Sequence, residues 1–288
     1  MLGQRLVTGA VLIASLLGLV WLETWVAEAS GFGGLVLLGV FAMVIVPLAA
    51  REAATLLRAC SLRTPTLAAV VLSVWMIGVS FGAVTIEARD AAVALALLGP
   101  VVALFAAFLI AAWGRCIETA WTSACGLLGI AVWTGLAGSF WLLAAHDHSA
   151  WLVAGLVLVT KMGDIGAYFT GMLIGRHKLI PWLSPGKTIE GLVGGVVFGA
   201  IGGFVLSMIS RGASPENELI PLAGILGGVA LTVVGAAGDL MESLLKRAAE
   251  AKDSGRLLPG MGGILDVLDS PLAAGPVAFL VLFLGTTV

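Results

Sequence analysis

Residues 91–113 read AAVALALLGPVVALFAAFLIAAW, an apolar run without a single charged side chain. A helix needs about 20 such residues to cross a bilayer, and comparable runs recur along the 288-residue chain. The sequence is 60% hydrophobic and only 11% charged, with a mean hydropathy of +1.10, whereas about a quarter of residues are charged in soluble proteins. The sequence therefore predicts an all-α polytopic integral membrane protein, built as one membrane domain over residues 1–288.

The apolar runs divide the chain into nine predicted transmembrane helices. They are Leu6–Ala27, Gly33–Ala50, Thr66–Ile86, Ala91–Trp113, Thr119–Ala145, Trp151–Gly175, Gly191–Ser210, Leu219–Ala237 and Val267–Thr287. Pro100 is predicted to bend the fourth helix, because proline removes a backbone donor and a neighbouring helix must then satisfy the carbonyl left over. We expect residues 1–150 to supply N-terminal helices and residues 151–288 to carry the helices and polar loops of the functional site.

Basic residues between the predicted helices fall almost entirely on one side. With an inside N-terminus, only Arg89 and Arg211 lie on the outer side, and Lys161 lies within a helix. The remaining basic residues share the other side and are Arg5, Arg51, Arg58, Arg63, Arg115, Arg176, Lys178, Lys187, Lys246, Arg247, Lys252 and Arg256. The positive-inside rule then places the N-terminus and both long polar loops in the cytoplasm and the C-terminus outside.

Some features leave alternatives open or exclude a class of partner. Arg5, the first apolar run and residues 27–30 (AEAS) also resemble a cleavable signal peptide, although the run is long for one. A net charge of −2 without a basic, aromatic-rich patch argues against nucleic acid as a partner. His146 and His148 have the spacing of zinc ligands, but no third ligand lies near them in the sequence. The oligomeric state stays open, a homodimer included.

Residues 238–269, GDLMESLLKRAAEAKDSGRLLPGMGGILDVLD, concentrate charge of both signs in an otherwise apolar chain. The first part favours a helix that continues the eighth span, and six polar residues would share one face of it. These residues are Asp239, Glu242, Ser243, Lys246, Arg247 and Glu250. A solvated, salt-bridged helix end is the simplest interpretation, but the residues that follow favour a binding site.

The second half of this stretch combines a glycine-rich turn with an acidic pair. Residues 252–263 (KDSGRLLPGMGG) would let backbone amides approach phosphate oxygens closely. Asp266 and Asp269 stand at the mouth of the last predicted helix, where carboxylates are costly without a cationic partner. Because Mg²⁺ takes carboxylate oxygens and bridges to phosphates, the whole stretch predicts a site for Mg²⁺ and a nucleotide phosphate.

A second polar stretch covers residues 161–191. Lys161 and Asp164 lie inside an apolar span, where ionisable residues are usually functional, and we expect them to pair with each other or with the site. The segment SPGKTIEG, residues 184–191, supplies Ser184 and Lys187 at the edge of the next span. It lacks the first glycine of a Walker A loop. His177 is interpreted as part of a basic patch at the membrane interface.

These two stretches together resemble the phosphatidate cytidylyltransferase (CDP-diacylglycerol synthase) family of integral membrane enzymes. The residues that match the family signature are Ser243, Lys246, Arg247, Lys252, Asp253, Gly255, Pro259, Gly260, Gly262, Gly263, Asp266 and Asp269. The segments DIGAYFTG (164–171) and SPGKTIEG resemble the family's middle motifs, so that the resemblance covers about residues 160–270. Met261 and Val267 depart from it, since they stand where the family has histidine and arginine. Neither side chain can donate to phosphate, which leaves open a changed acceptor lipid or a reduced activity.

The resemblance implies that CTP and phosphatidate react to give CDP-diacylglycerol and pyrophosphate, with Mg²⁺, at the cytoplasmic face of a bacterial inner membrane. It implies metal ligation by Asp239, Asp266 and Asp269, and catalytic roles for these three and Lys246. Substrate contacts would come from Asp164, Ser184, Lys187, Ser243, Arg247, Lys252 and Asp253. The alternatives are a CTP-dependent enzyme for another lipid, such as an isoprenoid phosphate, a lipid kinase, or a non-catalytic lipid-binding or transport protein. A transporter is disfavoured because the charges gather at one membrane face and not at the midplane.

Overall fold

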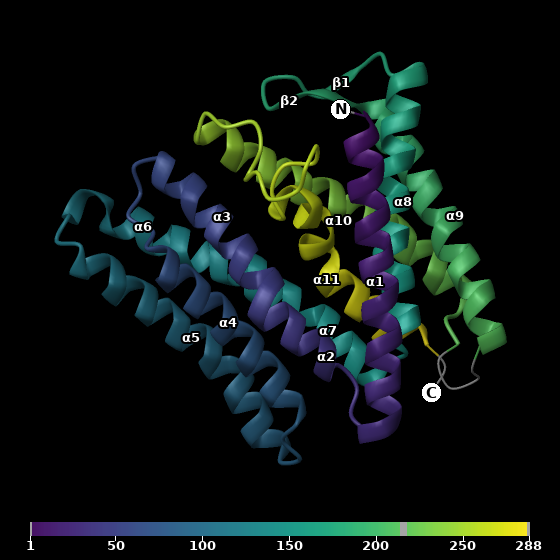
Figure 1. Cartoon of the computed structure of the whole chain (residues 1–288), viewed down its shortest axis with the longest axis horizontal. Coiled ribbons are helices and arrows are strands. Elements are labelled where there is room, and N and C mark those ends of the chain that lie inside the picture. The colour runs from purple at the N-terminus through teal and green to yellow at the C-terminus, as the bar shows by residue number, and fades with distance from the viewer. Residues whose placement is uncertain (1, 214–217, 287–288) are drawn as a thin grey trace. The chain divides into compact units, whose positions relative to one another are not determined.

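The computed structural model describes residues 2–213 and 218–286, and helices dominate it (Figure 1). The helices are α1 (Leu2–Ser30), α2 (Leu35–Val40), α3 (Val46–Ala59), α4 (Thr66–Val84), α5 (Arg89–Trp113), α6 (Ile117–Ile130), α7 (Ala137–Asp147), α8 (Ala150–Ile174), α9 (Ile189–Ala213), α10 (Pro221–Ala248) and α11 (Leu265–Gly285). Two π-helical segments, η1 (Phe41–Ile45) and η2 (Ala131–Leu136), join α2 to α3 and α6 to α7. Two short strands are β1 (Lys178–Ile180) and β2 (Ser184–Thr188).

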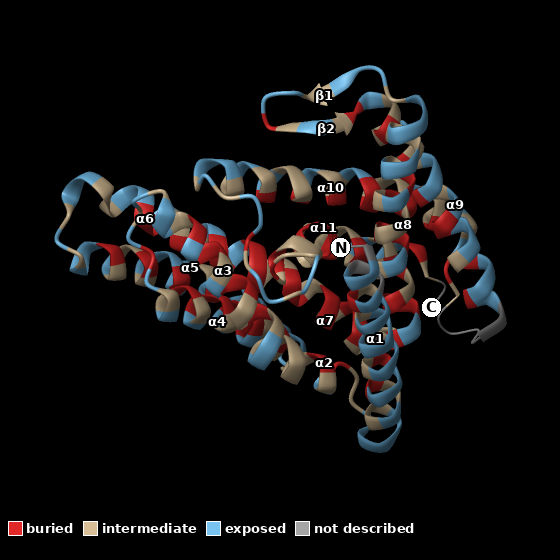
Figure 2. Cartoon of the chain, turned by 45° about the horizontal axis from the view of Figure 1, so that its top comes forward, coloured by how far each residue is buried: buried red, intermediate tan, exposed pale blue. Residues whose placement is uncertain are grey.

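Nine spans of the described chain are long and apolar enough to cross a membrane, which confirms the number predicted from sequence. They are Val7–Ser30, Leu35–Ala59, Thr66–Val84, Arg89–Trp113, Ile117–Asp147, Ala150–Ile174, Ile189–Arg211, Pro221–Ala248 and Leu265–Gly285. Large apolar side chains on their outer surfaces are exposed, as on α9, where Val193, Val197 and Ile201 are each at least half exposed (Figure 2). Apolar surface of this extent suits contact with lipid.

Some span boundaries differ from the sequence prediction in ways that matter for the site. The second span does not end at Ala50 but continues through α3 to Ala59, so that Arg51, Glu52 and Arg58 are helical. The alanine- and leucine-rich sequence after Arg51 explains this continuation, because these residues favour helix. The last span begins at Leu265, which places Asp266 in the first turn of α11.

A two-stranded antiparallel sheet corrects the all-α prediction. Lys178 pairs with Thr188 and Ile180 with Ser184, so β1 and β2 form a hairpin between α8 and α9. The β2 sequence, SPGKT, contains proline and glycine, which are depleted in strands, and therefore gives no local strand signal.

The chain divides into two compact units. Unit 1 comprises residues 1–15, 35–143 and 245–268, and unit 2 comprises residues 16–34, 144–244 and 269–288. In unit 1, α3, α4, α5 and α6 pack on one another. Pro100 lies inside an unbroken α5, and the indole of Trp75 on α4 donates to the carbonyl of Gly99, 3.1 Å away. Because Pro100 frees the carbonyl of Ala96, four residues earlier, this bond ties α4 to α5 beside the proline, and the support predicted for the freed carbonyl stays a prediction.

Close glycine contacts hold the helices of unit 2 together. An added Cβ at Gly203 would collide with the backbone of Gly224, and one at Gly199 would collide with the backbone of Gly228. Gly199 and Gly203 form a small-xxx-small pattern on α9, and Gly224 and Gly228 form one on α10. Such patterns allow membrane helices to approach until their backbones touch. α9 therefore packs directly on α10, the helix that carries most of the predicted site.

Contacts within unit 1 bring together three segments that are distant in the sequence. The hydroxyl of Thr8 on α1 donates to the carbonyl of Pro259, 2.8 Å away. Glu52 on α3 accepts a hydrogen bond from the Ser254 hydroxyl, also at 2.8 Å. The first turns of α1, the middle of α3 and the 252–264 loop therefore lie together within unit 1. That these segments face the cytoplasm stays a prediction.

Candidate metal and phosphate site

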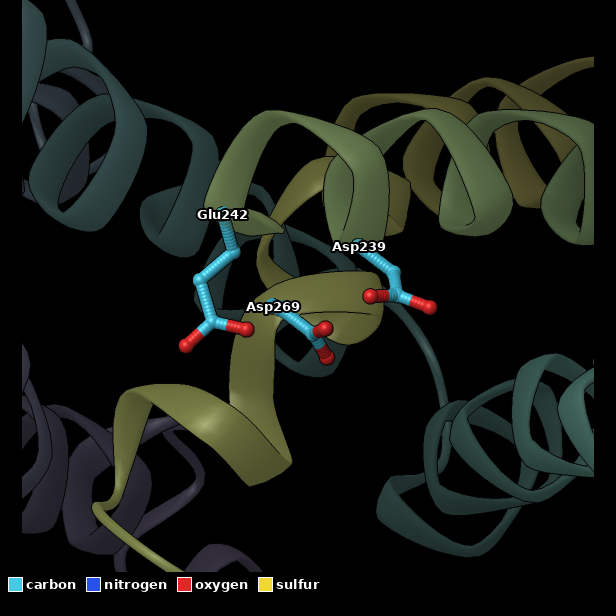
Figure 3. Close-up of side chains that lie close together, drawn as sticks. All are labelled: Asp239, Glu242 and Asp269. Atoms are coloured by element: carbon cyan, nitrogen blue, oxygen red, sulfur yellow. The ribbon is translucent and has the colours of Figure 1, made fainter. Parts of the chain in front are cut away.

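Three carboxylates converge in unit 2. Asp239 and Glu242 come from one face of α10 and Asp269 from the second turn of α11, and Figure 3 shows the three side chains gathered in one place. Each offers an oxygen, and these oxygens all lie within 4.8 Å of one another. Glu242 is only 1% and Asp269 only 5% exposed. We refer to Asp239, Glu242 and Asp269 as the carboxylate cluster.

Gly238 allows the two helices of the carboxylate cluster to meet. A Cβ at this position would lie 2.6 Å from the backbone oxygen of Asp269 and 2.6 Å from the Cβ of Ala273. Both distances are shorter than van der Waals contact, so only glycine lets α10 approach α11 this closely. The approach brings the neighbouring Asp239 beside Asp269.

Two lysines lie among these acidic groups. Lys187 forms an ion pair with Asp239 at 2.8 Å and also donates to the carbonyl of Ala236 at 3.3 Å. Lys161 pairs with Asp164 on α8 at 3.1 Å, which confirms the predicted intramembrane pair. Lys161, Asp164 and Asp239 are also charged neighbours of the Asp269 carboxylate. The site thus holds carboxylates for a cation beside ammonium groups for an anion.

Side chains around the hairpin position Lys187. Glu190, in the first turn of α9, accepts hydrogen bonds from the backbone N–H groups of Arg176 and His177, at 3.1 and 3.2 Å. The His177 ring, interpreted from sequence as part of a basic patch, lies 2.6 Å from the Glu190 carboxylate. Glu190 therefore closes the base of the hairpin, and Lys187 near the end of β2 is held between the strand pairing and α9. Ser184 begins the same strand and is half-buried.

In unit 1, Asp266 fastens the loop that precedes α11. Its Oδ1 forms an ion pair with Lys246 at 2.7 Å. Its Oδ2 accepts hydrogen bonds from the backbone N–H groups of Ser254 (2.8 Å) and Gly263 (2.7 Å) and, at 2.8 Å, shares the single proton of the Ser254 hydroxyl with Glu52. Both carboxylate oxygens are thus bound by protein donors. The metal role assigned to Asp266 by the resemblance stays a prediction.

Glu52 is a second anchor for the same loop. Its carboxylate accepts hydrogen bonds from the Ser254 hydroxyl (2.8 Å) and from the N–H groups of Ile264 (3.1 Å) and Leu265 (2.9 Å). A Cβ on Gly255 or Gly263 would collide with this carboxylate, so both glycines make room for it. This corrects part of the sequence interpretation of residues 252–263: the amides of Ser254 and Gly263 donate to the Asp266 carboxylate and are not presented to phosphate.

The other predicted substrate residues lie as follows. Ser243 is on α10 and donates to Asp239 Oδ1 at 3.4 Å. Arg247 is exposed on the last turn of α10, and Lys252 and Asp253 are exposed in the loop. The structure therefore joins Asp239 with Asp269, Lys187 and Ser243, and it joins Lys246 with Asp266.

Two acidic residues were not assigned from the sequence. The sequence places Glu242 on the same face of α10 as Asp239, one helical turn later, but it gives Glu242 no role in metal binding. Glu52 is 202 positions from Ser254, so no local pattern connects it to the loop.

Substituting Gly238 with alanine is expected to lower the free energy of unfolding by about 1–3 kcal/mol, because the added methyl group overpacks the contact between α10 and α11. It should also weaken binding of Mg²⁺, since Asp239 and Asp269 move apart. Thermal unfolding with and without Mg²⁺ measures both effects. Gly78→Ala is the matched control, because a Cβ at Gly78 on α4 meets nothing within 4 Å. Equal behaviour of the two variants would contradict the role given to Gly238.

The sequence of the chain matches a family of known proteins. The profile of the cytidylyltransferase family matches residues 3–284, nearly the whole chain. A phosphatidate cytidylyltransferase of Bacillus subtilis is 41% identical over 121 residues, covering 42% of this chain and 43% of that protein. A phosphatidate cytidylyltransferase of Mycobacterium tuberculosis is 37% identical over 157 residues, covering 54% and 46%.

A further relative is YnbB, an uncharacterised protein of Escherichia coli, which is 37% identical over 155 residues, or 48% of this chain and 50% of that protein. The chain thus spans about half the length of the curated relatives that it matches. The family profile, in contrast to these pairwise matches, covers the chain from the start of α1 to the end of α11. The chain belongs to the cytidylyltransferase family.

Proposed function

We propose that this protein transfers CMP from CTP to phosphatidate and forms CDP-diacylglycerol and pyrophosphate. The observation that carries the proposal is the carboxylate cluster, on helices long and apolar enough to cross a membrane, with Lys187 of β2 beside it. The names of the two phosphatidate cytidylyltransferases support this choice of substrate and reaction.

The carboxylate cluster suits Mg²⁺. Its donors are all carboxylate oxygens, the hard ligands that this ion prefers, and two of its three side chains are almost fully buried. Buried carboxylates this close repel one another, and a divalent cation would relieve that repulsion. Asp239, Glu242 and Asp269 would hold the ion. When bound, Mg²⁺ neutralises charge on the triphosphate and on the departing pyrophosphate.

The protein's own residues would bring two anions together and orient them. A phosphate oxygen of phosphatidate attacks the α-phosphorus of CTP, and the bond from that phosphorus to the pyrophosphate oxygen breaks. Lys187 can offset the negative charge of the reacting phosphates, and Lys246, Arg247 and Lys252 have the chemistry to do the same. Ser184 and Ser243 would donate hydrogen bonds to phosphate oxygens. Positioning and charge supply most of the catalysis in such a transfer.

The reaction is assigned to the cytoplasmic face of a bacterial inner membrane. The charge pattern favours a cytoplasmic N-terminus, and CTP is a cytoplasmic nucleotide. The hydrogen bond from Thr8 to Pro259 brings the 252–264 loop to the first turns of α1, which supports a common side for both. The loop residues Lys252 and Asp253 would then face the compartment that holds CTP.

Met261 bears on which lipid is the acceptor. Its side chain approaches α1, since a Cβ at Gly9 would lie 3.5 Å from the terminal methyl of Met261. It is therefore used for apolar packing and offers no proton to a substrate. Tests of the function should for this reason include isoprenoid phosphates beside phosphatidate.

Pyrophosphate release tests the proposal. The purified protein with CTP, Mg²⁺ and phosphatidate is expected to release pyrophosphate, and omission of any one component should stop the release. ATP in place of CTP should give little product. Release that does not require a lipid phosphate would refute the proposed reaction.

Lys187→Ala is expected to raise the KM for CTP by about tenfold or more, because a hydrogen bond between charged groups contributes about 1.5–3 kcal/mol. Initial rates of pyrophosphate release at varied CTP concentrations measure this change. Lys178→Ala is a matched control on the same hairpin, since its side chain is exposed. An unchanged KM in Lys187→Ala would show that Lys187 does not bind the nucleotide.

A further inference from the structure

A large cavity in unit 1 is not used by the proposed reaction. It has a volume of about 730 Å³, within the usual range for small-molecule sites. It lies between the α3–α4 turn and the C-terminal end of α5. Leu62, Leu109, Ile110 and Trp113 supply apolar surface, and Arg58 and Arg63 supply positive charge.

Protein contacts hold both guanidinium groups in place. Arg58 donates to the carbonyl of Thr64 (3.1 Å) and to the hydroxyls of Thr55 (2.9 Å) and Thr66. Arg63 donates to the carbonyl of Gly114 at 2.6 Å. A guanidinium carries five N–H donors, so these bonds leave donors on each group for a ligand. The positions of the donors are fixed before a ligand arrives, which lowers the entropic cost of binding.

No carboxylate in the described part of the chain forms an ion pair with these arginines. The ion pairs found there involve other residues, and all partners of Arg58 and Arg63 are neutral oxygens. Two fixed positive charges beside an apolar wall favour a ligand that is anionic at one end and apolar at the other.

The cavity also lies where spans end. The second span ends at Ala59, the third begins at Thr66 and the fourth ends at Trp113. Trp113 is 89% exposed, and tryptophan is enriched where a membrane meets water. The arginines therefore stand at the level of lipid headgroups, and Leu109 and Ile110 lie within the hydrophobic span.

We propose that this cavity binds an anionic phospholipid. Arg58 and Arg63 hold the phosphate, and Leu109, Ile110 and Trp113 contact the start of an acyl chain. This binding site shares no residue with the carboxylate cluster and does not depend on the proposed function. The ligand chemistry is a phosphate ester, and the apolar wall and the membrane-edge position select the lipid over a soluble phosphate.

Lipid retention by the purified protein tests the site. The probes are phosphatidylglycerol, which is anionic but not the proposed substrate, phosphatidylcholine, which is zwitterionic, and soluble glycerol 3-phosphate. Native mass spectrometry counts bound lipids, and thermal unfolding measures the stabilisation that each probe gives. The wild type should retain phosphatidylglycerol and unfold several degrees higher with it, whereas the other two probes should have little effect.

The double variant Arg58→Gln/Arg63→Gln should retain phosphatidylglycerol about tenfold or more weakly. Arg89→Gln, at the other end of α5, is the matched control and should behave as wild type. Arg58 and Arg63 also donate hydrogen bonds to the protein, so their replacement could disturb the fold. Leu109→Trp fills the cavity and keeps both arginines. This variant should also lose the lipid. Equal retention by Leu109→Trp and wild type, or equal stabilisation by glycerol 3-phosphate, would overturn the proposal.

Discussion

Replacing Asp269 with asparagine is expected to slow CDP-diacylglycerol formation on the order of a thousandfold and to abolish stabilisation by Mg²⁺. The variant removes one of the three charges that would hold the ion. Loss of metal-ion stabilisation costs several kcal/mol of activation free energy, and each 1.36 kcal/mol is a factor of ten in rate. Pyrophosphate release measures the rate, and thermal unfolding across a Mg²⁺ titration measures ion binding without reference to activity.

Without Mg²⁺, Asp269→Asn is expected not to reduce the stability of the protein. Three carboxylates lie close together, and two of them are nearly buried. Removal of one negative charge should therefore leave the metal-free variant at least as stable as the metal-free wild type. Asp90→Asn, at the exposed first turn of α5, is the matched control and should keep both the rate and the Mg²⁺ response. A wild-type Mg²⁺ response in Asp269→Asn would remove Asp269 from the metal site.

Glu52→Gln is expected to have the second largest effect, through the 252–264 loop. The carboxylate of Glu52 now accepts hydrogen bonds from the N–H groups of Ile264 and Leu265. In glutamine an NH₂ group replaces one of the two acceptor oxygens, so a donor would face these donors and a hydrogen bond would be lost. The loop should loosen, the KM for CTP should rise more than tenfold, and the free energy of unfolding should fall by about 1–3 kcal/mol. Trypsin should cleave faster after Lys252 and Arg256, both exposed in this loop.

A graded series separates positioning of the loop from a general loss of stability. Ser254→Ala removes the hydroxyl that lies between Glu52 and Asp266 and should have a smaller effect of the same kind. Glu118→Gln changes an exposed glutamate in the first turn of α6 and should leave the KM for CTP and the cleavage rate unchanged. If Glu52→Gln matches Glu118→Gln in both measurements, Glu52 does not position the loop.

The helical architecture could be predicted because each span must satisfy its own backbone in lipid and must be apolar for about 20 residues. The run at residues 91–113 is one example, and it lies within α5. The charged continuation of the eighth span was also predictable, since residues 238–248 contain strong helix formers and end α10 at Ala248. Local sequence decides both features.

Features that depend on distant contacts could not be predicted in this way. The strand β2 has an unfavourable sequence and exists because β1 pairs with it and Glu190 closes the base of the hairpin. Gly255 and Gly263 resemble a phosphate-binding loop, but the partner that explains them, Glu52, comes from a helix about two hundred residues earlier. An acidic side chain that approaches the loop from elsewhere leaves no signal near the loop itself.

The mass of the lipid product tests the central claim most directly. Phosphatidate is incubated with the purified protein, Mg²⁺ and CTP labelled with ¹³C in its cytidine, and the lipids are analysed by mass spectrometry. We expect a lipid heavier than phosphatidate by one CMP group and carrying the cytidine label, and we expect Asp269→Asn to form almost none. A lipid that gains one unlabelled phosphate, or label that enters only an isoprenoid phosphate, would contradict the assignment of phosphatidate cytidylyl transfer to this protein.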